Sequence, residues 1–360
     1  MYPYDHQTIE SYELEFLAVG EGSRSGDAIV ISRQPRNSPR RIVVVDGGYI
    51  TTGEQIVELI RTRWKTSKVD LVLSSHPDED HANGLLVVLQ ELSVAELWMH
   101  LPWEHDDGRR GLYGTRFADR SLDSRVAKNL DAARVLAEQA YEDGVKVVKP
   151  FTGRQAFDGV IEVVGPDPEY YEALLPDFRC VTESTSRSAL LSKAAGVVTR
   201  IRESLDIETL TDEGETSAEN NSSVVTQLRF NGDRFLLTGD AGIPALKRVA
   251  DRLDLSGTTP EDLRLIQVPH HGSHHNVGPS VLDRLIGPRQ KSDHLLRCAV
   301  VSAAPDGAPK HPNRKVTNAF RRRGSHVWAT QWKSLRYAHN APNYGYGPAE
   351  PLPFYAEVDE

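Results

Sequence analysis

One short turn of the sequence holds the residues best suited to chemistry, His76 to His81 (HPDEDH). Imidazole nitrogen and carboxylate oxygen are the ligands that borderline and hard divalent metals take. In an extended turn, residues i and i+2 point the same way, so His76 and Asp78 can share one ion, and Asp80 and His81 then face a second. The turn therefore predicts a metal site. The alternative is a solvated acidic loop in which Asp80 caps the helix that follows.

Two later stretches carry ligand-type residues at the ends of predicted strands. Residues 234–241 (RFLLTGDA) read as a strand that runs into Gly-Asp, which makes Asp240 a candidate bridging carboxylate. Residues 265–273 (LIQVPHHGS) read as a strand that ends in two adjacent histidines, His270 and His271. We expect these strand ends and the first turn to meet at one edge of the fold.

The order of these motifs resembles the metallo-β-lactamase superfamily, and within it the ComEC-type hydrolases, whose soluble domain accompanies bacterial DNA-uptake channels. The first motif of that branch has the form His-x-Asp-x-Asp-His, as residues 76–81 do. Three shorter stretches support the resemblance, namely VVVDGG at 43–48, NNSSVV at 220–225 and KHP at 310–312. The resemblance spans about residues 13 to 335, with an unmatched piece between about 100 and 215.

The resemblance implies an α/β (α+β) fold, a four-layer αββα sandwich in which two β-rich halves are each backed by helices. It also implies two divalent metal ions as cofactors, zinc or manganese, with magnesium also suited to a site rich in oxygen. Of the two adjacent histidines, His271 matches the ligand position and His270 would contact a phosphate or protonate a leaving group. The sequence leaves open which of the two is the ligand. The residues implied as metal ligands are His76, Asp78, Asp80, His81, Asp240 and His271.

The chain departs from the family pattern at two positions. Most superfamily enzymes have a histidine where Asn221 stands, so Asn221 is expected to be a weak ligand or a substrate contact. Ala18 stands where family members usually have an aspartate, which puts a catalytic role for the turn that follows it, at residues 20–26, in doubt. Asp46 is expected to be a structural carboxylate rather than a ligand. His311, which follows Lys310 on a late loop, is a candidate to hold a phosphate, and an ordinary surface loop is the alternative.

These features favour a metal-dependent hydrolase, in particular a phosphodiesterase or nuclease. A metal-bound water becomes hydroxide near neutral pH, and two ions can stabilise both the attacking and the leaving oxygen of a phosphodiester. We expect a nucleic acid or another phosphodiester as substrate. One alternative is hydrolysis of a small ester, amide or nucleotide, and another is a subunit gated by a protein partner in a multi-component bacterial system such as anti-phage defence. The residues expected to act in catalysis are Asp80, His270, Asn221 and His311.

Composition describes a globular protein rather than a disordered one. The chain has 360 residues, of which 39% are hydrophobic and 26% charged, and its net charge of −9 argues against a broad surface that coats nucleic acid. Its two cysteines, Cys180 and Cys298, form no CxxC pair and are expected to be buried thiols in a reducing cytosol. The first residues lack signal-peptide features, and no apolar run approaches the roughly 18 residues of a membrane helix. We therefore expect a cytoplasmic protein without membrane attachment.

We expect one metallo-β-lactamase-like domain over residues 1–345, with an insertion at about 104–215 and a C-terminal tail at 346–360. The insertion reads as a polar loop followed by a long helix, and it could form a lid, a substrate-selecting wall or a partner surface. His100 and His105 are isolated in sequence and are expected to be ordinary core or surface histidines.

Overall fold

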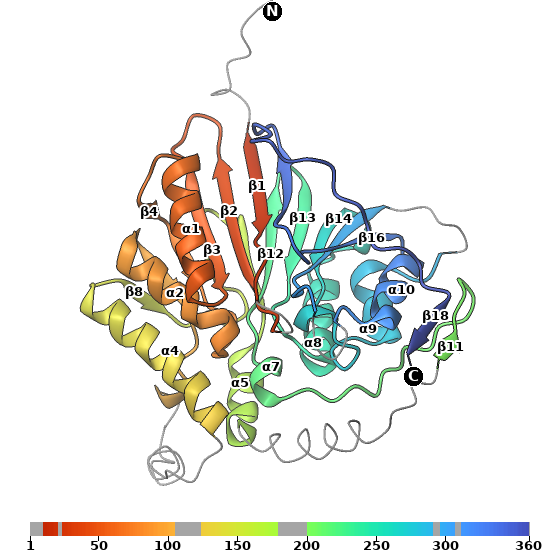
Figure 1. Cartoon of the computed structure of the whole chain (residues 1–360). Coiled ribbons are helices and arrows are strands. Elements are labelled where there is room, and N and C mark those ends of the chain that lie inside the picture. Colours follow the sequence, from red (N-terminus) through yellow and green to blue (C-terminus); the bar gives the residue numbers. More distant parts are fainter. Residues whose placement is uncertain are drawn as a thin grey trace, which may run out of the picture.

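Two β-sheets stand face to face in this computed structural model, and helices cover the outer side of each sheet (Figure 1). The structure describes residues 10–20, 24–104, 124–178, 200–290, 296–306 and 311–359, with the backbone alone for 124–131. In Figure 1, α1, α2 and α4 lie on one side of the sheets, and α8, α9 and α10 lie on the other. This arrangement confirms the four-layer αββα sandwich expected from the sequence.

The first sheet combines an antiparallel half with a parallel half. The strands from β17 to β3 pair antiparallel, and those from β3 to β8 pair parallel. Strands such as β2 and β3 are rich in Val and Ile and buried along most of their length, as expected of strands covered on both faces. The order of the sheet is β17 (Leu335–His339), β1 (Ser11–Phe16), β2 (Ala28–Gln34), β3 (Arg41–Gly47), β5 (Leu71–Leu73), β7 (Glu96–Trp98) and β8 (Lys146–Val148).

The second sheet repeats this plan. Its strands pair parallel from β16 to β13 and antiparallel from β13 to β9. Because β13 and β14 run parallel, the residues that follow them leave the sheet at the same edge. The order is β16 (Ser325–Ala329), β15 (Arg297–Val301), β14 (Leu263–Gln267), β13 (Asp233–Leu237), β12 (Val225–Phe230), β10 (Ile161–Gly165) and β9 (Gln155–Ala156).

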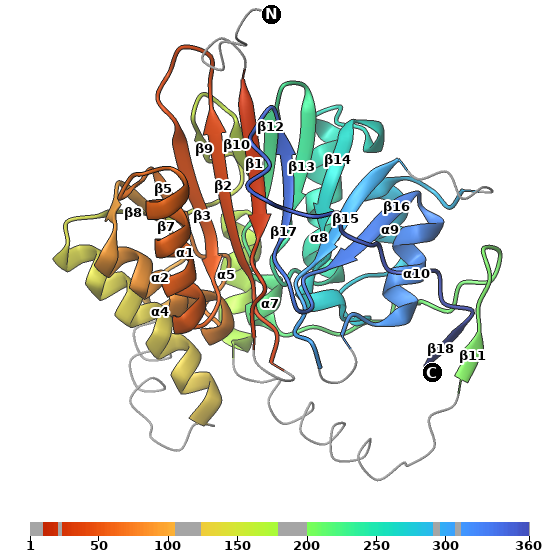
Figure 2. The same ribbon diagram turned by 45° about the horizontal axis from the view of Figure 1, so that its top comes forward.

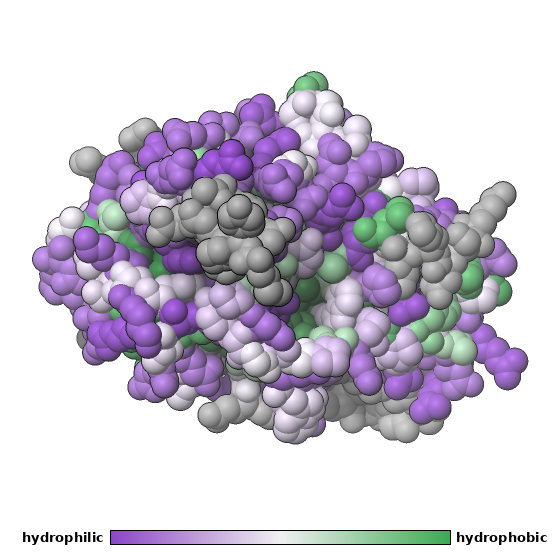
Figure 3. All heavy atoms as spheres, turned by 90° about the horizontal axis from the view of Figure 1, so that it is seen from above, coloured by the Kyte–Doolittle hydropathy of each residue, from purple (hydrophilic) through white to green (hydrophobic). Residues whose placement is uncertain are grey.

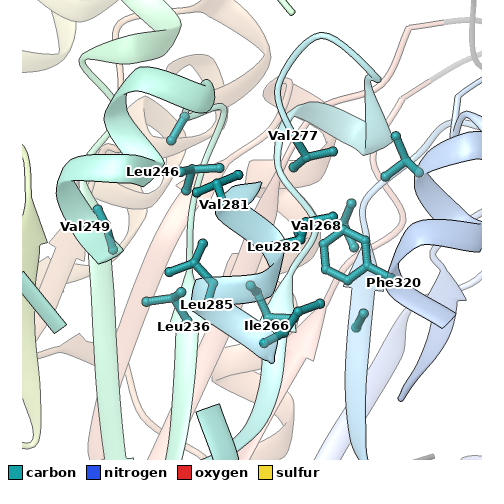
Figure 4. Close-up of a cluster of buried hydrophobic side chains, with 14 of the residues drawn as sticks. Leu236, Leu246, Val249, Ile266, Val268, Val277, Val281, Leu282, Leu285 and Phe320 are labelled. Carbon is teal, nitrogen blue, oxygen red and sulfur yellow. The ribbon is translucent and has the colours of Figure 1, made fainter. Parts of the chain in front are cut away.

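Three apolar layers hold the sandwich together. One lies between the sheets and includes Tyr12, Phe16 and Trp98. A second lies between the first sheet and its helices, and a third lies between the second sheet and its helices, where Leu246 and Leu285 face Leu236 and Ile266 (Figure 4). The helices are α1 (Ile50–Arg63), α2 (Glu79–Glu91), α4 (Ser124–Glu142), α8 (Ile243–Leu255), α9 (Pro279–Ile286) and α10 (Arg314–Arg322).

A close backbone approach fixes helix α2, which begins inside the His76–His81 turn. The amide of Gly84 donates a hydrogen bond to the carbonyl of Gly48 at 2.9 Å. A Cβ at Gly84 would collide with the carbonyl oxygen of Gly47, so only glycine allows α2 to lie this close to the end of β3. The packing of α2 on β3 thereby sets the position of the turn.

The segment expected as an insertion at about 104–215 is partly built into the sandwich. Its strand β8 completes the first sheet, and β9 and β10 complete the second. The bounds of the insertion stay a prediction, and part of the segment belongs to neither large sheet. That part includes α5 (Pro168–Leu174) and β11 (Arg200–Arg202), while His105 and Cys180 lie outside the described residues.

The C-terminal tail is packed rather than extended into solvent. Its strand β18 (Glu357–Asp359) pairs antiparallel with β11, beside α10 and away from both large sheets (Figure 2). Leu352 donates a backbone hydrogen bond to Val327 in β16 at 2.7 Å. The division between a domain ending at residue 345 and a separate tail stays a prediction.

The surface carries few large apolar side chains. Seen from above, hydrophilic residues dominate the face in Figure 3, and hydrophobic residues appear among them in small groups. Among the described residues, none of the helices combines the length and the apolar character that crossing a bilayer requires.

Candidate metal centre

The segments that carry the candidate ligands converge at one edge, where the two sheets meet. The His76–His81 turn follows β5, Asp240 follows β13, and the two adjacent histidines follow β14. The two halves are joined there by a backbone hydrogen bond of 2.8 Å from Val224 to Ser75. The structure thus brings together residues that are almost 200 positions apart in the sequence.

Asp240 lies at the centre of this cluster, and its two carboxylate oxygens face different groups. Its Oδ2 is 3.7 Å from Nε2 of His76 and 3.6 Å from Nε2 of His270. Asp78 joins the same side, with its Oδ2 3.7 Å from Nε2 of His76. We call His76, Asp78 and His270 the first donor set.

The other oxygen of Asp240 faces a second donor set, which consists of Asp80, His81 and His271. Oδ1 of Asp240 is 3.6 Å from Nε2 of His81, and Oδ2 of Asp80 is 3.6 Å from Nε2 of His271. Ligands about 2.0–2.2 Å from a shared tetrahedral ion lie about 3.4 Å apart. The separations in both donor sets are therefore close to those of ligands around an ion.

Several of these donor atoms are buried and have no hydrogen-bond partner among the described residues. They are Nε2 of His76, His81 and His271, and Oδ1 of Asp78 and Asp240. Leaving a buried polar atom unpaired costs about 1–3 kcal/mol. Because these atoms belong to the two donor sets around Asp240 and are of the types that metals bind, the residues fit a metal ion.

The far nitrogens of the buried histidines are held by the protein. Nδ1 of His81 is 2.9 Å from Oδ2 of Asp46, and Nδ1 of His271 is 3.0 Å from the carbonyl of Ser302. Nδ1 of His76 is 3.0 Å from the hydroxyl of Ser75. When each Nδ1 carries the proton, each Nε2 presents its lone pair to the centre.

Asp46 has a supporting position in the structure. Besides His81, it accepts hydrogen bonds from the amide and the hydroxyl of Ser75, both at 2.7 Å. Its backbone has a φ of 55°, which is uncommon for a residue other than glycine. Asp46 therefore connects the end of β3 to both donor sets, through His81 on one side and through Ser75 and His76 on the other.

His270 and His271 adopt left-handed backbone conformations, with φ of 46° and 55°. This geometry lets two adjacent residues direct their rings to opposite sides of Asp240. Nδ1 of His270 lies 3.0 Å from the side-chain amides of both Asn220 and Asn276. Both histidines of the pair therefore face the centre.

The charges in the cluster compensate one another. Burial alone would lower the pKa of His81 and His271, but the nearby carboxylates, Asp240 foremost, outweigh it: the pKa of His81 lies well above its ordinary value and that of His271 is raised to about 9. Burial would raise the pKa of Asp80, but the charges of the two histidines lower it to about 2. Protons on the histidines thus balance the carboxylates, so a cation would compete with protons for this site.

The structure places the remaining expected residues at the rim. Asn221 lies on α7 (Ala218–Asn221), where its side chain donates to the carbonyl of Thr216 at 3.3 Å, and its neighbour Asn220 is the residue that contacts His270. The ring of His311 lies 6.4 Å from that of His270. Burial, together with the charges of His271 and His270, lowers the pKa of His311 to about 3.

Asp27 belongs to the cluster although the sequence did not single it out. Donor atoms of Asp27, His81, Asp240 and His271 all lie within 4.8 Å of one another, and all four residues are buried. The amide of Asp27 donates to the carbonyl of Asp80 at 3.2 Å, and burial raises the pKa of its carboxyl group. In the sequence, the feature that could have indicated Asp27 is the Gly26-Asp27 pair directly before strand β2.

His100, expected to be an ordinary core or surface histidine, lies away from the donor sets. His100 is stacked against Tyr171, with ring centroids 4.2 Å apart, in a separate apolar cluster. Lys310, expected beside His311, lies outside the described residues.

Facing sheets backed by helices, with a buried cluster of aspartates and histidines at their shared edge, define a protein with the αββα sandwich fold and a candidate metal site. The chain belongs to the metallo-beta-lactamase superfamily, whose family model matches residues 24–285. Members of this superfamily are metallo-hydrolases. The comparison with curated proteins finds no match.

Solved structures resemble this chain at low sequence identity. MEM-A1, a subclass B3 metallo-beta-lactamase from a soil metagenome library, is 13% identical over 79% of this chain and 88% of its own, with a TM-score of 0.31. A metallo-beta-lactamase from Hirschia baltica is 12% identical over 78% and 94%, with a TM-score of 0.31. The long form of RNase Z from yeast is 12% identical over 84% and 38%, with a TM-score of 0.36.

Proposed function

We propose that the chain is a phosphodiesterase that cleaves nucleic acid and uses two divalent metal ions. The observation that carries the proposal is the position of Asp240, whose Oδ2 faces His76 and His270 while its Oδ1 faces His81. A carboxylate with one oxygen toward each of two donor sets is suited to bridge two ions. Bound there, two ions would provide a nucleophile from water at neutral pH and stabilise charge on phosphate oxygens.

In this proposal each donor set holds one ion, and both histidines of the adjacent pair are ligands. His270 completes the first set with His76 and Asp78. Its imidazole takes the place of the histidine that most superfamily enzymes have where Asn221 stands. This differs from the expectation that His270 stays free to act on the substrate. Each set would then offer two imidazoles, one carboxylate of its own and a share of Asp240, a mixture that suits zinc or manganese better than magnesium.

His311 would contact the substrate rather than transfer a proton. With a pKa of about 3, its imidazole is neutral at pH 7 and has no proton to give up readily. A neutral imidazole can still donate one hydrogen bond, and Nδ1 of His311 is buried without a partner among the described atoms. Its place beside His270 suits a contact with a phosphate oxygen.

The test combines metal analysis with an assay of cleavage. Purified protein should contain about two equivalents of a divalent metal, and it should cleave plasmid DNA or RNA when zinc or manganese is supplied. His76→Ala should lose cleavage and part of the metal. His339→Ala is the matched control, because His339 pairs with Tyr12 at the opposite end of the first sheet and should keep both properties.

Three other results of these assays would change or contradict the proposal. Two metal equivalents with intact polymers, but hydrolysis of bis(4-nitrophenyl) phosphate or a small ester, would move the proposal to a small-molecule substrate. Bound metal without any hydrolysis would favour a subunit that needs a protein partner. Protein without metal would contradict the proposal.

A further inference from the structure

Trp332 is an exposed aromatic residue held in an unfavourable backbone conformation. It lies in the turn between β16 and β17, 77% of it is exposed, and its φ is 71°. Large aromatic side chains usually gain stability from burial, and a positive φ is uncommon for a bulky residue. An exposed aromatic residue with a strained backbone is a candidate binding site, because such strain clusters at functional sites.

The turn that carries Trp332 is attached to the rim of the metal centre. The side-chain amide of Gln331 donates to the carbonyl of His311 at 3.3 Å, and the hydroxyl of Thr330 accepts from the amide of Ala303 at 3.1 Å. Ala303 directly follows Ser302, whose carbonyl holds His271. Two adjacent residues of the turn thus contact the same loops that support the centre.

A groove of about 580 Å³ begins at His311 and passes along the N-terminal end of α10. Among the described residues, its walls contain two cations, Arg200 and Arg314, and two anions, Asp306 and Asp359. Because these charges balance, phosphate contacts alone would hold a nucleic-acid strand weakly. The residues that line it include His311, Asn313, Arg314, Gln331, Tyr355 and Arg200.

We propose that Trp332 is a stacking platform for a base of single-stranded nucleic acid, whose backbone follows this groove to the metal centre. The inference rests on the proposed function and names its substrate as unpaired RNA or DNA. In a duplex both faces of each base are already stacked, whereas an unpaired base offers a free face to an aromatic side chain. Stacking would supply the binding energy that the balanced charges of the groove do not.

The experiment measures binding in EDTA, where no metal-dependent cleavage takes place. Oligo-dT and oligo-rU of twelve residues are titrated into the protein while tryptophan fluorescence is recorded, and an abasic twelve-mer supplies the same phosphates without bases. We expect both oligonucleotides to quench the fluorescence and the abasic strand not to do so. Trp332→Ala should lose the quenching and weaken binding about tenfold or more, which is the size of one base–aromatic contact.

Two further variants separate stacking from general surface effects. Trp332→Phe keeps an aromatic face and should restore most of the affinity, measured by anisotropy of a labelled strand. Tyr141→Ala removes another exposed aromatic, 55% exposed on α4, and should bind as the unaltered protein does. Equal affinity for Trp332→Ala and the unaltered protein, or equal binding of the abasic strand, would overturn the inference.

The outcome is separable from that of the proposed function. Stacking in EDTA without any cleavage in metal would leave this inference standing and contradict the nuclease. Cleavage of nucleic acid by a protein whose affinity does not depend on Trp332 would support the nuclease and contradict this inference. Tighter binding of oligo-rU than of oligo-dT would identify RNA as the substrate, and the opposite order would identify DNA.

Discussion

The two donor sets on either side of Asp240 differ in how they are supported. In the second set, the histidine side chains are 0% and 6% exposed, and a carboxylate and a backbone carbonyl hold their far nitrogens. In the first set, His270 is 33% exposed and its far nitrogen contacts neutral amides. A carboxylate behind a histidine raises its basicity and fixes its ring.

This difference indicates that the two donor sets have different roles, one in holding an ion and one in admitting the substrate. The second set is prepared to hold an ion tightly, because both of its histidines are buried and held in place before the ion arrives. The first set opens toward His311 and the groove, so it is the side where a substrate can enter. We therefore expect the ion in the first set to be the more weakly bound of the two.

The largest expected effect comes from the residue that the two sets share. Asp240→Asn keeps the size of the side chain but removes its charge, so both ions should be lost and cleavage should fall to the background. The loss should exceed the roughly 10–100-fold that the removal of a supporting contact costs. Elemental analysis and the plasmid assay measure it. If one full equivalent of metal remained with normal affinity, Asp240 would not bridge.

The adjacent histidines test the comparison directly. His271→Ala should remove the tightly bound ion and leave weak binding only. His270→Ala should remove the weakly bound ion, so that about one equivalent remains after dialysis against a mild chelator, as expected when one of two ions is lost. Competition with a chelating dye gives both affinities. The same residual stoichiometry in the two variants would show that the sets are not distinct.

Supporting residues should give smaller and one-sided effects. Asp46→Asn removes the charge behind His81, so the affinity for the second ion should fall by about 10–100-fold. A weaker effect on the first ion is expected through Ser75, which contacts both Asp46 and His76. Asp251→Asn, an exposed carboxylate on α8, is the matched control. Equal losses at both ions would contradict a role of Asp46 that acts mainly through His81.

The family resemblance carried by the motifs was enough for the fold, and local patterns located most of the residues of the cluster. The His76–His81 spacing lies within one turn, and Asp240 follows a recognisable strand, so both could be found without the structure. Asp27 was missed, because a Gly-Asp pair before a strand is a weak signal and its place in the cluster depends on a loop from the first sheet that packs against Asp80. The strands β8 and β9 are only three and two residues long, which is too short for apolar periodicity to show which sheet they join.

The adjacent histidines show a different limit. In an extended chain, neighbouring side chains point to opposite faces, so the sequence favours one ligand from the pair. Here both residues have positive φ, which no local residue pattern predicts, and both rings have a donor atom near the carboxylate of Asp240. In the same way, the turn at residues 220 and 221 is short, and which asparagine faces inward depends on where α7 begins.

The smallest expected effect separates those two asparagines. Asn220→Ala removes one of the two amides at Nδ1 of His270, while Asn276 remains, so the affinity for the first ion should fall by about tenfold or less. Asn221→Ala should have a smaller effect on that ion, because its side chain donates to Thr216 and not to His270. The same dye competition measures both, and the second ion serves as an internal reference. A larger loss in Asn221→Ala than in Asn220→Ala would restore Asn221 as the contact expected from the sequence and reverse the order found in the structure.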